Sequence, residues 1–123
     1  MSYDEAVRLA QKMAEEKGGI MQGYTTMGYA DAFIRCPEYM AAEGMHILAS
    51  PAKGDTAAVA GESGAAALGA MANILLDEAL AEYKKMLKLD ENSRILCIST
   101  EGDTDRENYQ NVVWDGKYSK FDE

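Results

Sequence analysis

The sequence is poor in the residues from which metal sites and hydrolytic triads are built. It holds a single histidine, His46, so a histidine-rich metal site is excluded and a serine triad would have only this one candidate base. Its two cysteines, Cys36 and Cys97, lie far apart and lack the spacing of a metal site. Cys97 alternates within an apolar run, which predicts a buried apolar thiol. His46 is expected to be a structural or surface residue.

Basic residues are also scarce, and long apolar runs are absent. Twelve lysines and arginines stand against 21 acids, giving a net charge of −9, whereas nucleic acids and anionic membranes attract basic surfaces. No apolar run approaches the length of a membrane span. The acidic start, Met1–Glu5, does not resemble a signal peptide. These absences predict a soluble, cytoplasmic protein with no nucleic-acid partner and no membrane partner.

What remains is one domain's worth of chain, residues 1–123, with a mostly helical pattern. Apolar periodicity and capping residues predict helices over about 3–17, 37–48 (interrupted by Gly44), 65–72, 77–87 and 105–112. Asp77 and Asp105 are expected to cap the last two. The small side chains of 65–72 predict a helix packed closely on several sides. Residues 117–123 are expected to form a frayed tail.

Two segments read as strands. Arg94–Ile98 is short, rich in branched side chains and bounded by turn formers, which predicts a buried strand; Ala57–Ala60 is a weaker candidate. The fold class is therefore predicted as α/β, mostly helical with one or two parallel-type strands. The loop Ser99–Asp105 follows the predicted strand Arg94–Ile98, at the position where ligands sit in open α/β sheets. Because one buried strand needs neighbours on both sides, the chain either pairs with another copy or is part of something larger.

Two local features could carry chemistry. Gly61–Gly64 opens a helix and could hold an anion on its backbone N–H groups, but it lacks a P-loop lysine and is better interpreted as a capped turn. Acids cluster after the predicted strand and could bind magnesium or calcium, although the calcium-loop pattern is not met. These acids are Glu101, Asp103, Asp105 and Glu107. The favoured interpretation is a helix cap with an acidic first turn.

Several stretches, in order and naturally spaced, together carry a family resemblance. They are Phe33–Met45, Gly61–Ala66, Ser99–Asp105, Asn108–Tyr109 and Val112–Gly116. They resemble the carboxyl-terminal part of diaminopropionate ammonia-lyase, of the fold-type-II pyridoxal-phosphate enzymes, over residues 29–116. Residues 3–27 resemble segments further upstream in that family. The resemblance implies a partial fold-type-II domain that is internally shortened and lacks the amino-terminal part.

The resemblance also implies a site for pyridoxal phosphate. Ser99 would face the ring nitrogen with Thr100 beside it, and Glu62 and Ser63 would stand near the same ring. A neutral hydroxyl there leaves the ring nitrogen unprotonated, which suits β-elimination. The family's Schiff-base lysine, in a Ser-Phe-Lys-like setting, and its glycine-rich phosphate loop are not matched, and Lys53 in its loop is no substitute.

The chain is therefore expected to be a truncated relative with no catalytic residue of its own. The family reaction, β-elimination of 2,3-diaminopropionate to pyruvate and ammonia, would need the missing segments, and only with them would the chain meet a small amino-acid substrate. Two alternatives stay open. One is a non-catalytic domain that forms a homodimer or larger homo-oligomer, or binds a partner that completes its sheet. The other is an acidic module that binds a divalent metal around Asp103 and Asp105.

Overall fold

The computed structural model describes Ala32 and residues 34–121. The chain divides into two units, Met1–Pro37 and Glu38–Glu123. The described residues of the first unit, Ala32 and 34–37, form no helix or strand. The helix expected over 3–17 and the resemblance of 3–27 lie outside the described residues.

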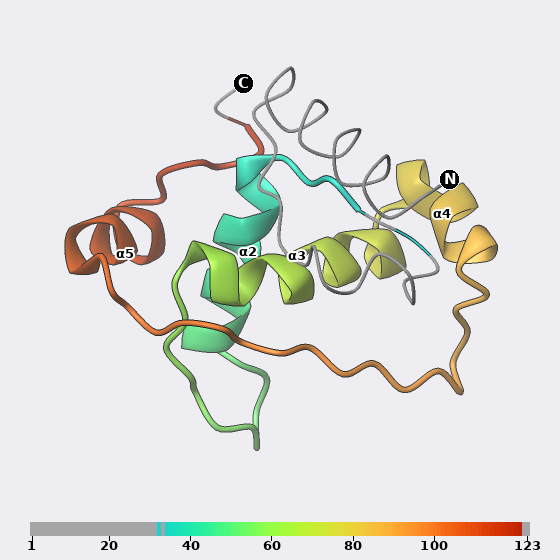
Figure 1. Cartoon of the computed structure of the whole chain (residues 1–123), viewed down its shortest axis with the longest axis horizontal. Helices are drawn as coiled ribbons and strands as arrows, with labels where there is room; N and C mark the ends of the chain where they lie inside the picture. Colours follow the sequence, from blue (N-terminus) through green and yellow to red (C-terminus); the bar gives the residue numbers. More distant parts are fainter. Residues whose placement is uncertain (1–31, 33, 122–123) are drawn as a thin grey trace, which may run out of the picture. The chain divides into compact units, whose positions relative to one another are not determined.

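The second unit is helical throughout its regular structure (Figure 1). Its elements are α2 (Glu38–Ala49), α3 (Glu62–Leu76), the 3-10 helix η2 (Glu78–Leu80), α4 (Ala81–Met86) and α5 (Arg106–Val113). Asp77 accepts a hydrogen bond from the Ala79 N–H at 3.0 Å, and Asp105 accepts one from the Asn108 N–H at 3.0 Å. Both predicted caps are confirmed, because a carboxylate there satisfies N–H groups that the helix itself leaves unpaired.

Helices α2 and α3 cross where each carries a glycine. A β-carbon on Gly44 would collide with the carbonyl oxygen of Ala65, and one on Gly69 would collide with that of Met40. The two backbones therefore touch, which only glycine permits. The predicted interruption of the helix at Gly44 is wrong, since α2 runs unbroken through that residue. The close packing expected of the small-residue helix is confirmed by the burial of Ala65 and Gly69.

The core lies beside this crossing and includes α5. Its buried members are Ala42, Met45, Ala60, Ala65 and Val112, with Leu48, Tyr109, Val113 and Tyr118 packed against them. His46 Nε2 donates a hydrogen bond of 2.7 Å to the carbonyl oxygen of Val112, which ties α2 to the last turn of α5. His46 is thus structural, which is one of the two roles that the sequence predicts for it.

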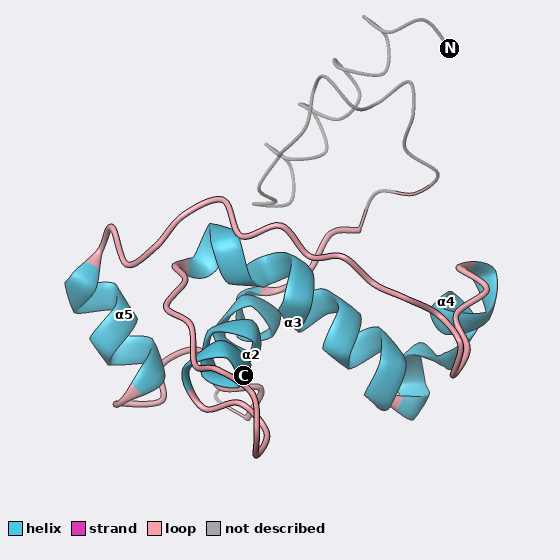
Figure 2. Cartoon of the chain, turned by 90° about the horizontal axis from the view of Figure 1, so that it is seen from below, coloured by secondary structure: helices cyan, strands magenta, loops and turns pink. Residues whose placement is uncertain are grey.

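The predicted strands are wrong. Figure 2 shows helices and loops but no strand in the described part of the chain, so the mostly helical pattern is confirmed and the α/β assignment is not. Residues 94–98 are extended, and no backbone hydrogen bond joins them to the backbone of another described residue. A strand exists only as part of a ladder, and the second unit offers Arg94–Ile98 no neighbour.

The side chains of this extended segment are correspondingly open. Ile95, Leu96 and Ile98 are 42 %, 86 % and 70 % exposed. Cys97 is half-buried and not buried as predicted. In the second candidate segment, Ala57–Ala60, one hydrogen bond of 2.8 Å runs from the Ala58 N–H to the Leu48 carbonyl oxygen, and no ladder forms.

Residues 117–121 of the predicted tail contact other parts of the second unit. Lys120 Nζ lies 2.8 Å from Asp77 Oδ2 and 5.7 Å from the centre of the Tyr39 ring. Tyr118 packs against the core. Among the described residues no single helix is long and apolar enough to cross a membrane. By length and composition, α3 passes that test only jointly with Glu78–Met86, across a bend of 94°.

Candidate functional site

The structure brings together the two stretches that the sequence singled out, Gly61–Gly64 and Ser99–Gly102. The Ser63 N–H donates a hydrogen bond of 3.2 Å to Glu101 Oε1. A β-carbon on Gly64 would lie 2.7 Å from Ser99 Oγ, so the loop rests directly on the start of α3. The four residues predicted near a cofactor ring therefore come from two adjoining segments. Glu62 and Ser63 are half-buried, and Ser99 and Thr100 are exposed.

The amino terminus of α3 is partly neutralised from within the chain. Its cap residue is Gly61, which has no side chain to accept from the first-turn N–H groups. The Glu101 carboxylate takes up one of these donors and places negative charge at the positive end of the helix dipole. The turn that could hold an external anion thus already holds a carboxylate of its own chain.

The hydroxyl predicted to face a cofactor ring is held by its own loop. Ser99 Oγ donates a hydrogen bond of 3.2 Å to the carbonyl oxygen of Glu101. Because the serine is exposed, its oxygen lone pairs stay open to solvent or to a ligand. Thr100 lies next to it on the same exposed segment.

The acidic side chains of this loop make contacts within the chain. Asp105 caps α5, and Asp103 Oδ2 lies 3.6 Å from Arg106 Nε in an exposed ion pair. Thr104 Oγ1 donates to Glu101 Oε2 at 3.4 Å. In the part of the chain that the structure describes, no three histidine, cysteine or acidic side chains are grouped to hold a metal ion. The capping interpretation accounts for Asp105, and the metal alternative has no supporting cluster.

A small cavity of about 70 Å³ lies between this loop, α2 and α5. Its lining residues are Met45, Gly61, Glu62, Glu101, Thr104, Asp105, Asn108 and Tyr109. Sites for small-molecule cofactors occupy roughly 300–1,000 Å³. This cavity is too small to enclose a cofactor, and the four residues form at most one wall of a site.

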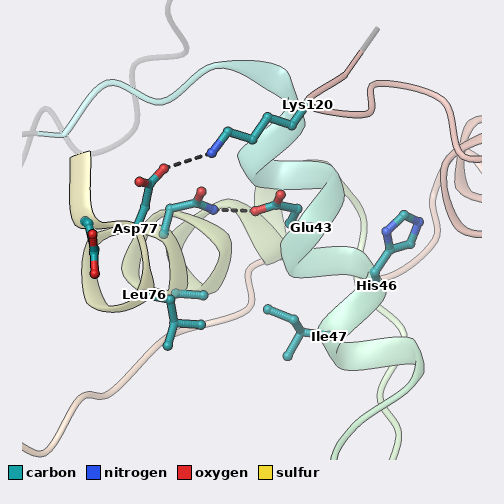
Figure 3. A pocket seen from close by; sticks show the side chains of 9 residues that line it. Glu43, His46, Ile47, Leu76, Asp77 and Lys120 are labelled. Carbon is teal, nitrogen blue, oxygen red and sulfur yellow. Dashed lines mark hydrogen bonds and ion pairs between the residues drawn. The ribbon is translucent and has the colours of Figure 1, made fainter. Parts of the chain in front are cut away.

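A larger cleft lies elsewhere, between α2 and α3 (Figure 3). It measures about 650 Å³ and is lined by Glu43, His46, Ile47, Ala72, Asn73, Leu76, Asp77, Glu78 and Lys120. Its polar groups are largely paired with one another, Lys120 with Asp77 and the Asn73 amide with Glu43. Three carboxylates make it unsuited to a phosphate ester. The four residues predicted near a cofactor ring lie away from this cleft, in the loop Ser99–Gly102 and the first turn of α3.

The sequence alone gave no sign of this cleft, because its residues come from α2, the end of α3 and the tail. The glycine crossing, the hydrogen bond between Asn73 and Glu43, and the Lys120–Asp77 ion pair bring them together. Figure 3 shows Ile47 and Leu76 facing the same opening from the two helices. No local spacing pattern could have shown this arrangement.

The described residues fit one end of pyridoxal phosphate and not the other. Hydroxyls suited to the ring end are present in Ser99 and Thr100, but the helix turn that could take a phosphate is filled by Glu101. Lys53 lies in an exposed loop. The pKa of Lys117 is raised, first by its hydrogen bond to Tyr118 and more weakly by Glu62.

Comparison with known proteins agrees with the family resemblance. No family model matches the chain. It is 40 % identical over 90 residues to diaminopropionate ammonia-lyase of Escherichia coli K12, which is 73 % of this chain and 23 % of the relative. It is 38 % identical over 86 residues to the Salmonella typhimurium enzyme, covering 69 % and 21 %.

Solved structures of the Escherichia coli enzyme match as well. The apo form superposes with a TM-score of 0.64 at 39 % identity, over 68 % of this chain and 23 % of that one. The complex of that enzyme with an aminoacrylate–pyridoxal-phosphate azomethine intermediate gives the same TM-score and identity, over 68 % and 22 %. The likeness thus holds in both sequence and fold.

These matches show that the chain is related to the ammonia-lyases. Specifically, it is a partial homologue of diaminopropionate ammonia-lyase, as the sequence motifs predicted. It spans less than a quarter of the length of the curated relatives it matches.

Proposed function

We propose that this chain provides the ring-facing wall of a pyridoxal-phosphate site of the ammonia-lyase type, and that it is not catalytic alone. The wall consists of Ser99, Thr100, Glu62 and Ser63. The observation that supports this most strongly is the contact between the loop Ser99–Gly102 and the first turn of α3. These segments are far apart in the sequence, both carry the family resemblance, and they meet at one place.

The chemistry of these side chains suits that role. When bound, the cofactor acts as an electron sink for a bond-breaking step at the substrate. The Ser99 hydroxyl presents a neutral group to the ring nitrogen, so no carboxylate there holds a proton on the ring. Glu62 stands at the half-buried side of the same wall. In a complete site this arrangement would serve elimination of ammonia from 2,3-diaminopropionate.

The same proposal makes the second unit part of a fold-type-II domain. The segment Arg94–Ile98 would then lie against the remainder of the enzyme. Its run of branched apolar residues suits a segment that is covered by other parts of a protein. Catalysis, substrate and cofactor anchoring would depend on that remainder, which supplies a lysine and a phosphate loop.

An aldehyde-free cofactor analogue tests the wall directly. We expect 4-deoxypyridoxine 5-phosphate, added at millimolar concentration to isotopically labelled chain, to shift the amide resonances of residues 62–63 and 99–100. The double variant Ser99→Ala with Thr100→Val should lose these shifts, whereas Thr56→Ala, in an exposed loop, should keep them. Shifts confined to the cleft around Asn73, or no shifts at all, would contradict the proposal.

A second candidate function is association through the open apolar segment. Leu96 and Ile98 are largely exposed, and the backbone of 94–98 is unpaired within the described residues. These features favour a homodimer, a larger homo-oligomer or a partner that covers this segment. The ammonia-lyase proposal accounts for the same exposure and also for the site residues, so we place it first.

A further inference from the structure

The first turn of α3 depends on a carboxylate from a distant loop. Ser63 is the second residue of α3, and an N–H in that position has no acceptor within its own helix. The cap residue Gly61 offers no side chain. Glu101, 38 positions further along the chain, supplies the acceptor at 3.2 Å. A charged acceptor at this end of a helix is also favoured by the helix dipole.

Glu101 is tied at three points. Its Oε1 accepts from Ser63, its Oε2 accepts from Thr104 Oγ1 at 3.4 Å, and its carbonyl oxygen accepts from Ser99 Oγ at 3.2 Å. The side chain thus links the loop to α3, and the main chain of the same residue holds the Ser99 hydroxyl. One residue couples the helix to the side chain predicted to face the ring.

Two glycines make this approach possible. A β-carbon on Gly61 would lie 2.6 Å from Glu101 Oε1 and 2.7 Å from the carbonyl oxygen of Gly102. A β-carbon on Gly64 would lie 2.7 Å from both the carbonyl oxygen of Glu101 and Ser99 Oγ. Real β-carbons do not approach main-chain oxygens so closely, so any larger residue would push the loop away from the helix.

We propose that Glu101 is a positioning residue: its carboxylate clamps the loop Ser99–Gly102 onto α3 and so sets the place of the Ser99 and Thr100 hydroxyls. The inference rests on the proposed function where it concerns the cofactor ring. The clamp itself is a property of the second unit. Glu101 touches neither ring nor substrate in this account, and it acts through Ser99.

Amide hydrogen exchange of Ser63 tests the clamp without any ligand. Because the Ser63 N–H has no other acceptor, Glu101→Ala should speed its exchange by roughly tenfold, as expected for loss of one charge-assisted hydrogen bond. Glu101→Gln keeps an acceptor oxygen and should restore part of the protection. Glu107→Ala, an exposed acid in the first turn of α5, is the matched control. Unchanged Ser63 exchange in Glu101→Ala would overturn the clamp.

The analogue titration then tests positioning. In Glu101→Ala we expect the shifts at residues 99–100 to weaken at least several-fold, with protection of the α2–α3 core amides unchanged. Gly64→Ala, which keeps the carboxylate but displaces the loop, should weaken them equally. If both variants respond like the parent chain, Glu101 does not position the hydroxyls. If the parent chain itself does not respond, the proposed function is contradicted, while the clamp stands or falls on Ser63 exchange.

Discussion

At the residue scale, the ion pair between Lys120 and Asp77 links the tail to the end of α3, and the Asp77 carboxyl group reports on it. The pKa of Asp77 lies below its usual value, first because Lys120 donates a hydrogen bond to it and then because the Ala79 N–H does. A depressed folded-state pKa contributes stability above the unfolded-state pKa, and that contribution is lost as the pH falls through the folded-state value. Acid therefore weakens this link between the tail and the end of α3.

Replacing the lysine should move this titration. In Lys120→Gln we expect the pKa of Asp77 to rise toward its ordinary value, because the largest cause of the depression is gone. The pH dependence of stability below the unfolded-state pKa should weaken accordingly. Carboxyl carbon NMR over an acid titration measures the pKa of Asp77 in the parent chain and in the variant. Lys53→Gln, in an exposed loop, should leave Asp77 as it is; an unmoved Asp77 in Lys120→Gln would mean that the ion pair does not hold the tail.

At the scale of elements, the crossing of α2 and α3 organises the second unit. It places the core, the cleft around Asn73 and the start of α3, on which the loop Ser99–Gly102 rests. The crossing needs two residues without side chains, Gly44 and Gly69, because each faces a carbonyl oxygen of the other helix. Site and fold therefore depend on the same helix contact.

Alanine at either crossing position should separate the helices. Alanine favours an isolated helix by about 1 kcal/mol over glycine. At these two positions, however, the added methyl group would collide with main-chain atoms of the other helix. We expect Gly44→Ala and Gly69→Ala each to lower the free energy of unfolding by about 2–3 kcal/mol, as overpacking does. Urea denaturation followed by circular dichroism measures the change.

A matched glycine serves as the control for these variants. A β-carbon on Gly102 would meet nothing within 4 Å, so Gly102→Ala should change the free energy of unfolding by less than about 0.5 kcal/mol. If the crossing variants were as stable as this control, close contact between α2 and α3 would not be required for folding.

The elements that could be predicted from sequence are those set by local rules. Asp77 and Asp105 mark helix starts because a cap and its N–H partner are two or three residues apart. The predicted interruption at Gly44 was wrong because the low helix propensity of glycine is a local property, whereas its packing against α3 is not local. The prediction of a strand at Arg94–Ile98 was wrong for the same reason, because a strand needs pairing partners that the local sequence does not reveal.

The site residues were found by family resemblance rather than by spacing. Ser99 and Glu62 lie 37 positions apart by their numbers, and no periodicity joins them. The contact of Glu101 with α3 could not be predicted, because in the sequence Glu101 is one of several neighbouring acidic residues. The signal that could have found it is the pair Gly61 and Gly64, which leaves the first turn of α3 open to a close approach.

At the scale of the whole molecule, the second unit leaves much apolar surface uncovered. Leu76 is 83 % exposed and Met86 is 75 % exposed, in addition to the open segment 94–98. Exposed apolar residues in such number favour burial against another surface. In the ammonia-lyase proposal that surface is the remainder of the enzyme, and in the alternative it is a second copy or another partner.

Without the remainder of an ammonia-lyase to cover this apolar surface, the chain should self-associate. We expect the chain to form dimers or larger species at micromolar concentration and the double variant Leu96→Lys with Ile98→Lys to shift it toward monomer, because charge on an open edge opposes pairing. Sedimentation velocity measures the distribution. Val59→Lys, at an exposed residue outside the segment, is the control. A parent chain that stays monomeric over this range would exclude the oligomeric alternative.

The proposed function gives this chain one wall of a pyridoxal-phosphate site without the lysine that would complete it. Its most direct test is to add pyridoxal phosphate, record the absorbance, reduce with borohydride and map any adduct by mass spectrometry, with and without 2,3-diaminopropionate. We predict no internal-aldimine band at about 410–430 nm, only scattered substoichiometric lysine adducts, and no pyruvate. A stoichiometric adduct on one lysine together with pyruvate formation would contradict the account.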